Sequence, residues 1–171
     1  MKKSLLGVAC ATGIVAAGLV AAGVAATPAS AASLPRCTNS AMSARLVNLQ
    51  GAAGSVVGDL RLTNVSSGSC WTRGYPGVSY VGNGDGTQIG RAARWDAGTI
   101  TTVTLAPGQW ADSPIQMVDV HNYPAETCRP TPVDGLRVYV PGSALATFVR
   151  HPTTGCRSTA VTTISVKPLE R

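Results

Sequence analysis

The placement of four cysteines constrains the fold of this chain more than any other feature of its sequence. The cysteines that follow residue 31 are Cys37, Cys70, Cys128 and Cys156. The midpoint between Cys37 and Cys70 lies in the segment Gly51-Ala52-Ala53-Gly54. The midpoint between Cys128 and Cys156 lies in Pro141-Gly142. Both segments are typical of turns, and residues equidistant from a hairpin turn face each other across an antiparallel ladder. Of the three possible pairings, this symmetry predicts the disulfides Cys37–Cys70 and Cys128–Cys156.

The first 31 residues have the pattern of a secretory signal peptide. Lys2 and Lys3 precede an almost wholly apolar run from Leu5 to Ala26, and Ala29-Ser30-Ala31 supplies the small residues of a cleavage site. We expect cleavage after Ala31, which removes residues 1–31 together with Cys10; a retained membrane helix is the alternative. The prediction is a secreted, extracellular protein of one domain (32–171), free or associated with the cell wall and without a membrane span, in a compartment where disulfides form.

Residues 32–171 lack helical periodicity and carry short alternating runs rich in Val, Thr and Ile between Pro and Gly residues. Asn83-Gly84-Asp85-Gly86 is a strong hairpin signal, because these residues tolerate a positive φ. The pattern predicts an all-β fold, an antiparallel β-sandwich of about eight strands. The expected strand segments are 44–50, 56–64, 77–82, 87–91, 99–105, 109–120, 135–140, 144–150 and 160–167.

The charge of the predicted mature chain excludes some classes of protein. Removing Lys2 and Lys3 from the 14 Lys and Arg leaves 12 cations against 8 Asp and Glu. The cations are scattered along the chain, so we expect no nucleic-acid partner. A nucleotide-dependent enzyme is also excluded, because the chain has no glycine-rich phosphate loop.

Ordered motifs along the chain carry a resemblance to a known family. They are Cys70-Trp71-Thr72-Arg73-Gly74-Tyr75-Pro76-Gly77-Val78, Gln88-Ile89-Gly90, Val103-Thr104-Leu105-Ala106-Pro107-Gly108, Asn122-Tyr123-Pro124, Cys128-Arg129-Pro130 and Gly135-Leu136-Arg137-Val138-Tyr139. Together they resemble the secreted actinobacterial family catalogued as the domain of unknown function numbered forty-two thirty-two. The resemblance implies an exported, immunoglobulin-like sandwich with two disulfides, found free or on lipoprotein and membrane-anchored stalks. It implies no activity, because none is established for the family.

Catalytic and metal-binding constellations are weak in this sequence. Hydrolytic triads need a histidine base, and the only histidines, His121 and His151, accompany no Gly-x-Ser-x-Gly motif. Zinc is not favoured, because the chain has no Cys-x-x-Cys spacing. Copper would have to use His121 and His151 with Met117 and Met42, but Met117 has the pattern of a core residue. We therefore expect no catalysis, no metal and no cofactor.

Tryptophans offer the best predicted binding surface. Trp95 follows Arg91 and Arg94 in an expected loop between Gly90 and Gly98, where an exposed indole next to arginine can stack on sugars or anchor a protein. The alternative is that Trp95 belongs to the core. We expect Trp110 to be a core residue, and Tyr75 to fix a corner by bonding to the backbone.

These observations predict a secreted, non-catalytic binding module for an extracellular protein or polysaccharide. The predicted ligand-binding residues are Trp95, Arg91 and Arg94. The alternative function is inhibition of a protease or another hydrolase through a rigid exposed loop near Gly135 or Trp95.

Overall fold

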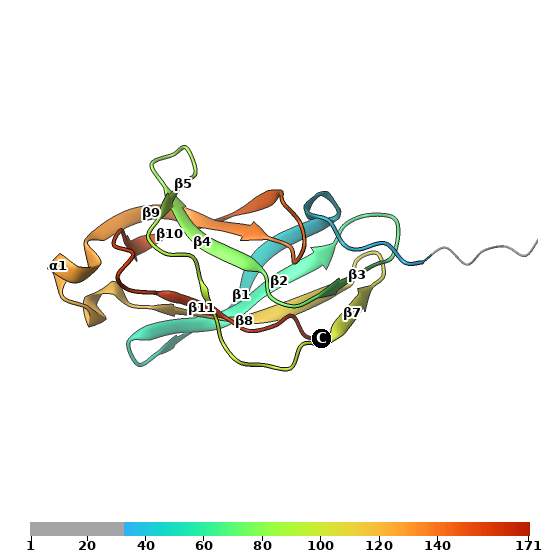
Figure 1. The fold of residues 1–171 in the computed structure, drawn as a ribbon, viewed down its shortest axis with the longest axis horizontal. Helices are drawn as coiled ribbons and strands as arrows, with labels where there is room; N and C mark the ends of the chain where they lie inside the picture. The colour runs from blue at the N-terminus through green and yellow to red at the C-terminus, as the bar shows by residue number, and fades with distance from the viewer. Residues whose placement is uncertain (1–32) are drawn as a thin grey trace, which may run out of the picture. The chain divides into compact units, whose positions relative to one another are not determined.

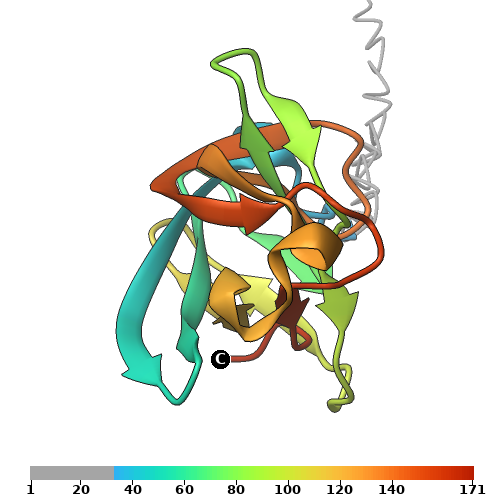
Figure 2. The ribbon, with the colours of Figure 1, turned by 90° about the vertical axis from the view of Figure 1, so that its left-hand side faces the viewer.

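The computed structural model describes residues 33–171, and the predicted signal peptide (1–31) lies outside this range. The described residues fold as an all-β sandwich with the two predicted disulfides, which confirms the predicted fold class (Figure 1). Figure 2 shows the two main layers end-on. Among the strands of residues 33–171, neighbours run antiparallel except for the parallel pair of β6 (Arg94–Trp95) and β11 (Ile164–Val166).

Three sheets make up the described fold. The first has the order β1-β2-β8-β11-β6 and adds β1 (Met42–Ala52), β2 (Ser55–Asn64) and β8 (Trp110–Val118) to β11 and β6. The second has the order β10-β9-β4-β5, with β10 (Ala146–Cys156), β9 (Pro130–Tyr139), β4 (Gly77–Gly82) and β5 (Thr87–Ile89). The third pairs β3 (Cys70–Arg73) with β7 (Thr102–Leu105). Short helical segments are η1 (Asn39–Ala41), η2 (Val120–Asn122) and α1 (Ala125–Cys128).

Alternation along the strands builds the core between the sheets. In β7, Val103 and Leu105 are buried and their neighbouring threonines are exposed, as the sequence predicts. Fully buried leucines such as Leu60, Leu62 and Leu136 each contribute about 1.5–3 kcal/mol by leaving water. The sheets therefore form a rigid scaffold for residues at their edges and ends.

The prediction that Trp110 is a core residue is wrong. In β8 the buried positions are Ala111, Ser113, Ile115 and Met117, so the alternate residues face outward. Trp110 has the outward parity and is 47% exposed. The guanidinium of Arg61 lies over its ring, 4.6 Å from the centroid.

The Cys128–Cys156 pairing is correctly predicted, although the two cysteines do not face each other within the β9–β10 ladder. Cys156 pairs with Pro130 at the end of the β9–β10 ladder, and Cys128 lies two residues before Pro130 in α1. Arg129 ends α1 with a positive φ of 54°, which turns the chain from the helix into β9. The Cα atoms of the two cysteines are 4.7 Å apart.

The Cys37–Cys70 disulfide is correctly predicted, but the expected local geometry is wrong. The β1–β2 ladder ends where Met42 faces Asn64, before it reaches the cysteines. Residues 35–37 instead run parallel to the start of β3: Trp71 N donates to Pro35 O at 3.0 Å, and Cys37 N donates to Trp71 O at 2.8 Å.

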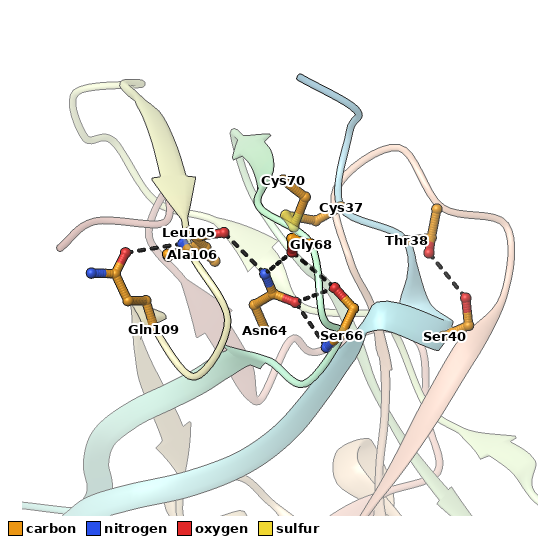
Figure 3. The surroundings of a disulfide bond; sticks show 10 residues. All are labelled: Cys37, Thr38, Ser40, Asn64, Ser66, Gly68, Cys70, Leu105, Ala106 and Gln109. Atoms are coloured by element: carbon orange, nitrogen blue, oxygen red, sulfur yellow. Dashed lines mark hydrogen bonds between the residues drawn. A yellow bond between two sulfur atoms is a disulfide. The ribbon is translucent and has the colours of Figure 1, made fainter. Parts of the chain in front are cut away.

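Asn64 shapes the loop that returns the chain to Cys70 (Figure 3). Its buried Nδ2 donates to the carbonyls of Gly68 and Leu105 at 2.8 and 2.9 Å. Its Oδ1 accepts from the Ser66 backbone N–H at 3.0 Å and from the Ser66 hydroxyl at 2.7 Å. A buried amide satisfied in this way is costly to remove, because its partners lose their bonds in a dry environment.

Candidate functional site: an aromatic groove

Trp95 lies at an edge of the sandwich, in a short strand where the sequence predicted a loop. Arg94 and Trp95 form β6, which pairs parallel to Ser165 and Val166 of β11, and Asp96 N donates to Val166 O at 2.9 Å. The indole is 62% exposed, so Trp95 is not a core residue. The backbone of Trp95 is therefore fixed by a sheet while its side chain faces outward.

Tyr75 supports the Trp95 indole from one side. The two rings stack with centroids 5.0 Å apart and an angle of 10° between their planes. The Tyr75 hydroxyl donates to the backbone carbonyl of Asp96 at 2.9 Å, which is the corner-fixing role expected from the sequence. This ring stack and this hydrogen bond both hold Trp95 in one orientation.

Asp96 and Arg94 reinforce the same corner. Arg94 Nε donates to Asp96 Oδ1 at 2.7 Å. The hydrogen bond from Arg94, with a further contribution from Ser165, lowers the pKa of the Asp96 carboxyl from its ordinary value. Asp96 is thus negatively charged at neutral pH, where it forms an ion pair with Arg94.

A groove with a volume of about 390 Å³ runs beside the stacked rings. Its walls are mostly apolar and come from segments far apart in the sequence. The side chains that define this aromatic groove are Tyr75, Trp95, Ile100, Tyr139, Pro141 and Arg73.

Tyr139 forms part of the aromatic groove where β9 pairs with β4. It faces Gly77 in this pairing, and its ring lies 3.4 Å from the position of a Cβ on Gly77, which is an ordinary van der Waals distance. Buried Asn39 secures the neighbouring turn, because its Oδ1 accepts from the Val140 backbone N–H at 2.9 Å. The backbone between Tyr139 and Pro141 is therefore fixed by a buried side-chain hydrogen bond.

The structure separates the three residues that the sequence grouped as a ligand site. Trp95 lines the aromatic groove. Arg94 is engaged with Asp96, so its role is to support the corner. Arg91 is exposed but does not line the groove.

Sequence reasoning missed Tyr139, Ile100, Pro141 and Arg73 as groove residues. The alternation of β9 gives a partial signal, because buried Leu136 and Val138 place Tyr139 on the outer face. No signal in the sequence places Tyr139 next to Tyr75, because this depends on the pairing of β9 with β4.

Gly135, proposed from the sequence as lying near an inhibitory loop, is not in a loop. It lies within β9, where it faces Arg150 of β10 and Val81 of β4. A Cβ at this position would overlap the backbone carbonyl oxygen of Val149. Gly135 is thus required for close strand packing.

Both histidines line a second cavity, of about 380 Å³, at the α1 end of the sandwich. Asp119 Oδ1 is 2.8 Å from His121 Nδ1, and the bond from the His121 backbone N–H, ahead of that from its ring, lowers the pKa of Asp119. Burial lowers the pKa of His151.

Met117 lines this cavity and is a core residue, as predicted. Within residues 33–171, no three His, Cys, Asp or Glu side chains are grouped to hold a metal ion.

The fold and the groove define a disulfide-bonded all-β domain with an aromatic surface site. The family described as Domain of unknown function (DUF4232) matches residues 37–170, and the chain belongs to this family. No curated protein and no solved structure matches the chain. Among residues 33–171, no helix is long and apolar enough to cross a membrane.

Proposed function

We propose that this protein is a secreted, non-catalytic binding module whose site is the aromatic groove. The observation that carries the proposal is the exposed Trp95 indole, held by Tyr75 at the edge of the groove. The partner is an extracellular protein or polysaccharide, and the two disulfides support a place outside the cell.

Preorganisation favours a binding role for this groove. A ligand that covers a fixed indole does not have to supply the entropy cost of ordering it. Tryptophan and tyrosine are also enriched among the few residues that dominate binding energy. Trp95 and Tyr75 combine both properties at one position.

The composition of the groove supports a non-catalytic role. General acid–base chemistry needs a titratable side chain within reach of the substrate. Within residues 33–171, the groove wall contains no histidine, aspartate or glutamate. Its titratable side chains are Arg73, Tyr139 and Tyr75, and the Tyr75 hydroxyl already donates to a backbone carbonyl. These residues are suited to holding a ligand.

Retention of the purified protein on cell-wall fractions and on immobilised culture supernatant tests the proposal. Trp95→Ala should abolish most of the retention, while Trp110→Ala, a matched change at another exposed tryptophan, should leave it intact. Equal retention of the two variants would contradict the proposal. Titration against a panel of proteases tests the inhibitor alternative, which requires loss of protease activity in proportion to the protein added.

A further inference from the structure

A second hollow adjoins the aromatic groove and shares a residue with it. It has a volume of about 500 Å³ and lies on the outer face of the β3–β7 sheet. Arg73 lines both depressions, and Trp71 lies beyond it on the same face of β3. In the pairing of the two strands, Thr104 faces Trp71 and Thr102 faces Arg73. One open surface thus extends from Trp95 past Arg73 to Trp71.

Arg36 places a second cation along this surface. Its guanidinium lies 5.1 Å from the centroid of the Trp71 ring. It also packs against Gly142, which lines the aromatic groove, because a Cβ there would overlap the Arg36 guanidinium. Arg36 therefore lies against one residue of each depression, although it lines neither of them as Arg73 does.

The charges of Arg36 and Arg73 are available to a ligand. The ion pairs within residues 33–171 involve Arg61, Arg94 and His121, and neither Arg36 nor Arg73 belongs to one. Among the described residues, neither depression is lined by a carboxylate that would compensate these two charges. Guanidinium groups bind carboxylates and phosphates through paired, charge-assisted hydrogen bonds. The surface is therefore complementary to an anion.

We infer that the aromatic groove and the adjoining hollow form one elongated site for an anionic glycan, whose sugar rings lie on Trp95 and Trp71 and whose acidic groups meet Arg73 and Arg36. The inference rests on the proposed function, because it names the ligand class of the same site.

A glycan fits this surface better than an acidic peptide does. Both depressions are open, whereas protein partners gain most from anchor side chains in closed, dry pockets. Sugar rings instead present flat C–H faces to aromatic rings and hydroxyls to neighbouring polar groups. Thr102 and Thr104 supply such hydroxyls beside Trp71.

Two matched pairs of oligosaccharides test the inference by calorimetric titration of the full chain. The carboxylate pair is hexagalacturonate and its fully methyl-esterified form, and the phosphate pair is phosphomannopentaose and mannopentaose. We expect the acidic member of at least one pair to bind about tenfold more tightly than its neutral counterpart, the factor of one charge-assisted hydrogen bond. The pair that shows the difference identifies the acidic group.

Variants assign the effect to the site. Arg73→Ala should remove most of the preference for the acidic member, whereas Arg150→Ala, which removes the same charge from an exposed position of β10, should leave it unchanged. Trp95→Ala should weaken both members of the pair by a similar factor.

Several results would overturn the inference. Equal affinity for acidic and neutral members, or no binding of any of the four sugars, removes the anionic-glycan assignment. Equal effects of Arg73→Ala and Arg150→Ala show attraction by net charge alone. A hexaglutamate peptide that binds as tightly as the acidic sugars replaces the glycan with an acidic peptide. Where Trp95-dependent retention on cell-wall fractions persists without sugar binding, the ligand class is wrong and the binding function stands.

Discussion

Trp95 and Trp110 are both exposed tryptophans with one ring face covered, yet their surroundings differ. Arg61 covers Trp110, and Asp112 holds Arg61 in turn with two hydrogen bonds of 2.8 and 2.7 Å. Tyr75 covers Trp95, and the Tyr75 hydroxyl bonds to the backbone next to Trp95. Trp110 thus belongs to a local polar cluster on a strand face, while Trp95 stands at the edge of a groove.

The difference shows that exposure alone does not identify a binding residue. Arg61 satisfies its charge with Asp112 and stacks on Trp110, so this cluster is complete without a ligand. The surface around Trp95 has an apolar groove on its open side. Nearby lie Arg36 and Arg73, which form no ion pair within residues 33–171. Uncovered apolar surface and charges without ion-pair partners around a side chain are a better guide to function than its exposure.

Removing the support of Trp95 should give the largest change. Tyr75→Ala loses ring contacts, apolar burial and a hydrogen bond, and should lower the free energy of unfolding by about 2–3 kcal/mol. Denaturant titration of Tyr75→Ala and Arg61→Ala measures the free energy of unfolding of both variants. A larger loss of stability in Arg61→Ala would reverse the ranking of the two clusters.

The hydroxyl of Tyr75 should account for part of this effect. Tyr75→Phe keeps the stacked ring and removes the hydrogen bond to Asp96, which should cost about 1 kcal/mol. For a domain of this size, the thermal midpoint should fall by about 3 °C. An unchanged midpoint would mean that the ring stack alone fixes the corner.

Trp95→Ala should change stability little, in contrast to its expected effect on binding. Because the indole is largely exposed, the variant loses the aromatic pair, worth about 0.5–1.5 kcal/mol. Truncation of a buried aromatic residue would cost about 3–5 kcal/mol. Thermal melts of Trp95→Ala and Trp110→Ala should therefore both stay near that of the parent, and a large drop for Trp95 would contradict its surface role.

The ion pair beside Trp95 should give the smallest effect, and it should depend on pH. The folded-state pKa of Asp96 is lowered, chiefly by Arg94. Its contribution is present above the unfolded pKa of about 3.9 and is lost as the pH falls through the folded-state value. Arg94→Ala should therefore melt slightly below the parent at pH 7, and the two midpoints should converge on acidification below pH 4. A difference between the two thermal midpoints that persists in strong acid would assign the lost stability to packing of the Arg94 side chain.

Alternation and turn chemistry predict much of this fold, because both act locally. The expected segment 77–82 coincides with β4, and 56–64 differs from β2 by one residue. The short strands β3 and β6 were missed, because two to four residues become strands only when a distant partner lies beside them. Trp110 was placed in the core from its residue type, although the parity of β8 indicates the surface.

The candidate site was predicted only in part. A Trp beside arginines marked Trp95, and a tyrosine between glycine and proline marked Tyr75 as a corner residue. The groove joins the β3–β4 turn, β6 and the β9–β10 turn. Which turns meet at one edge depends on sheet order, and no local pattern in the sequence encodes that order.

The Cys37–Cys70 disulfide gives the domain a defined response to mechanical load. A pull on residue 33 passes through Cys37 directly to Cys70 and β3, so it bypasses the β1–β2 hairpin. At the other end, Leu169 N donates to Gly74 O at 2.9 Å, one residue beyond β3. Tension between the ends of the described chain therefore converges on β3, the strand that carries Trp71 and Arg73. The 33-residue separation closed by this bond cannot lengthen, so stretching loads β3 while the β1–β2 hairpin, which the disulfide encloses, carries no tension.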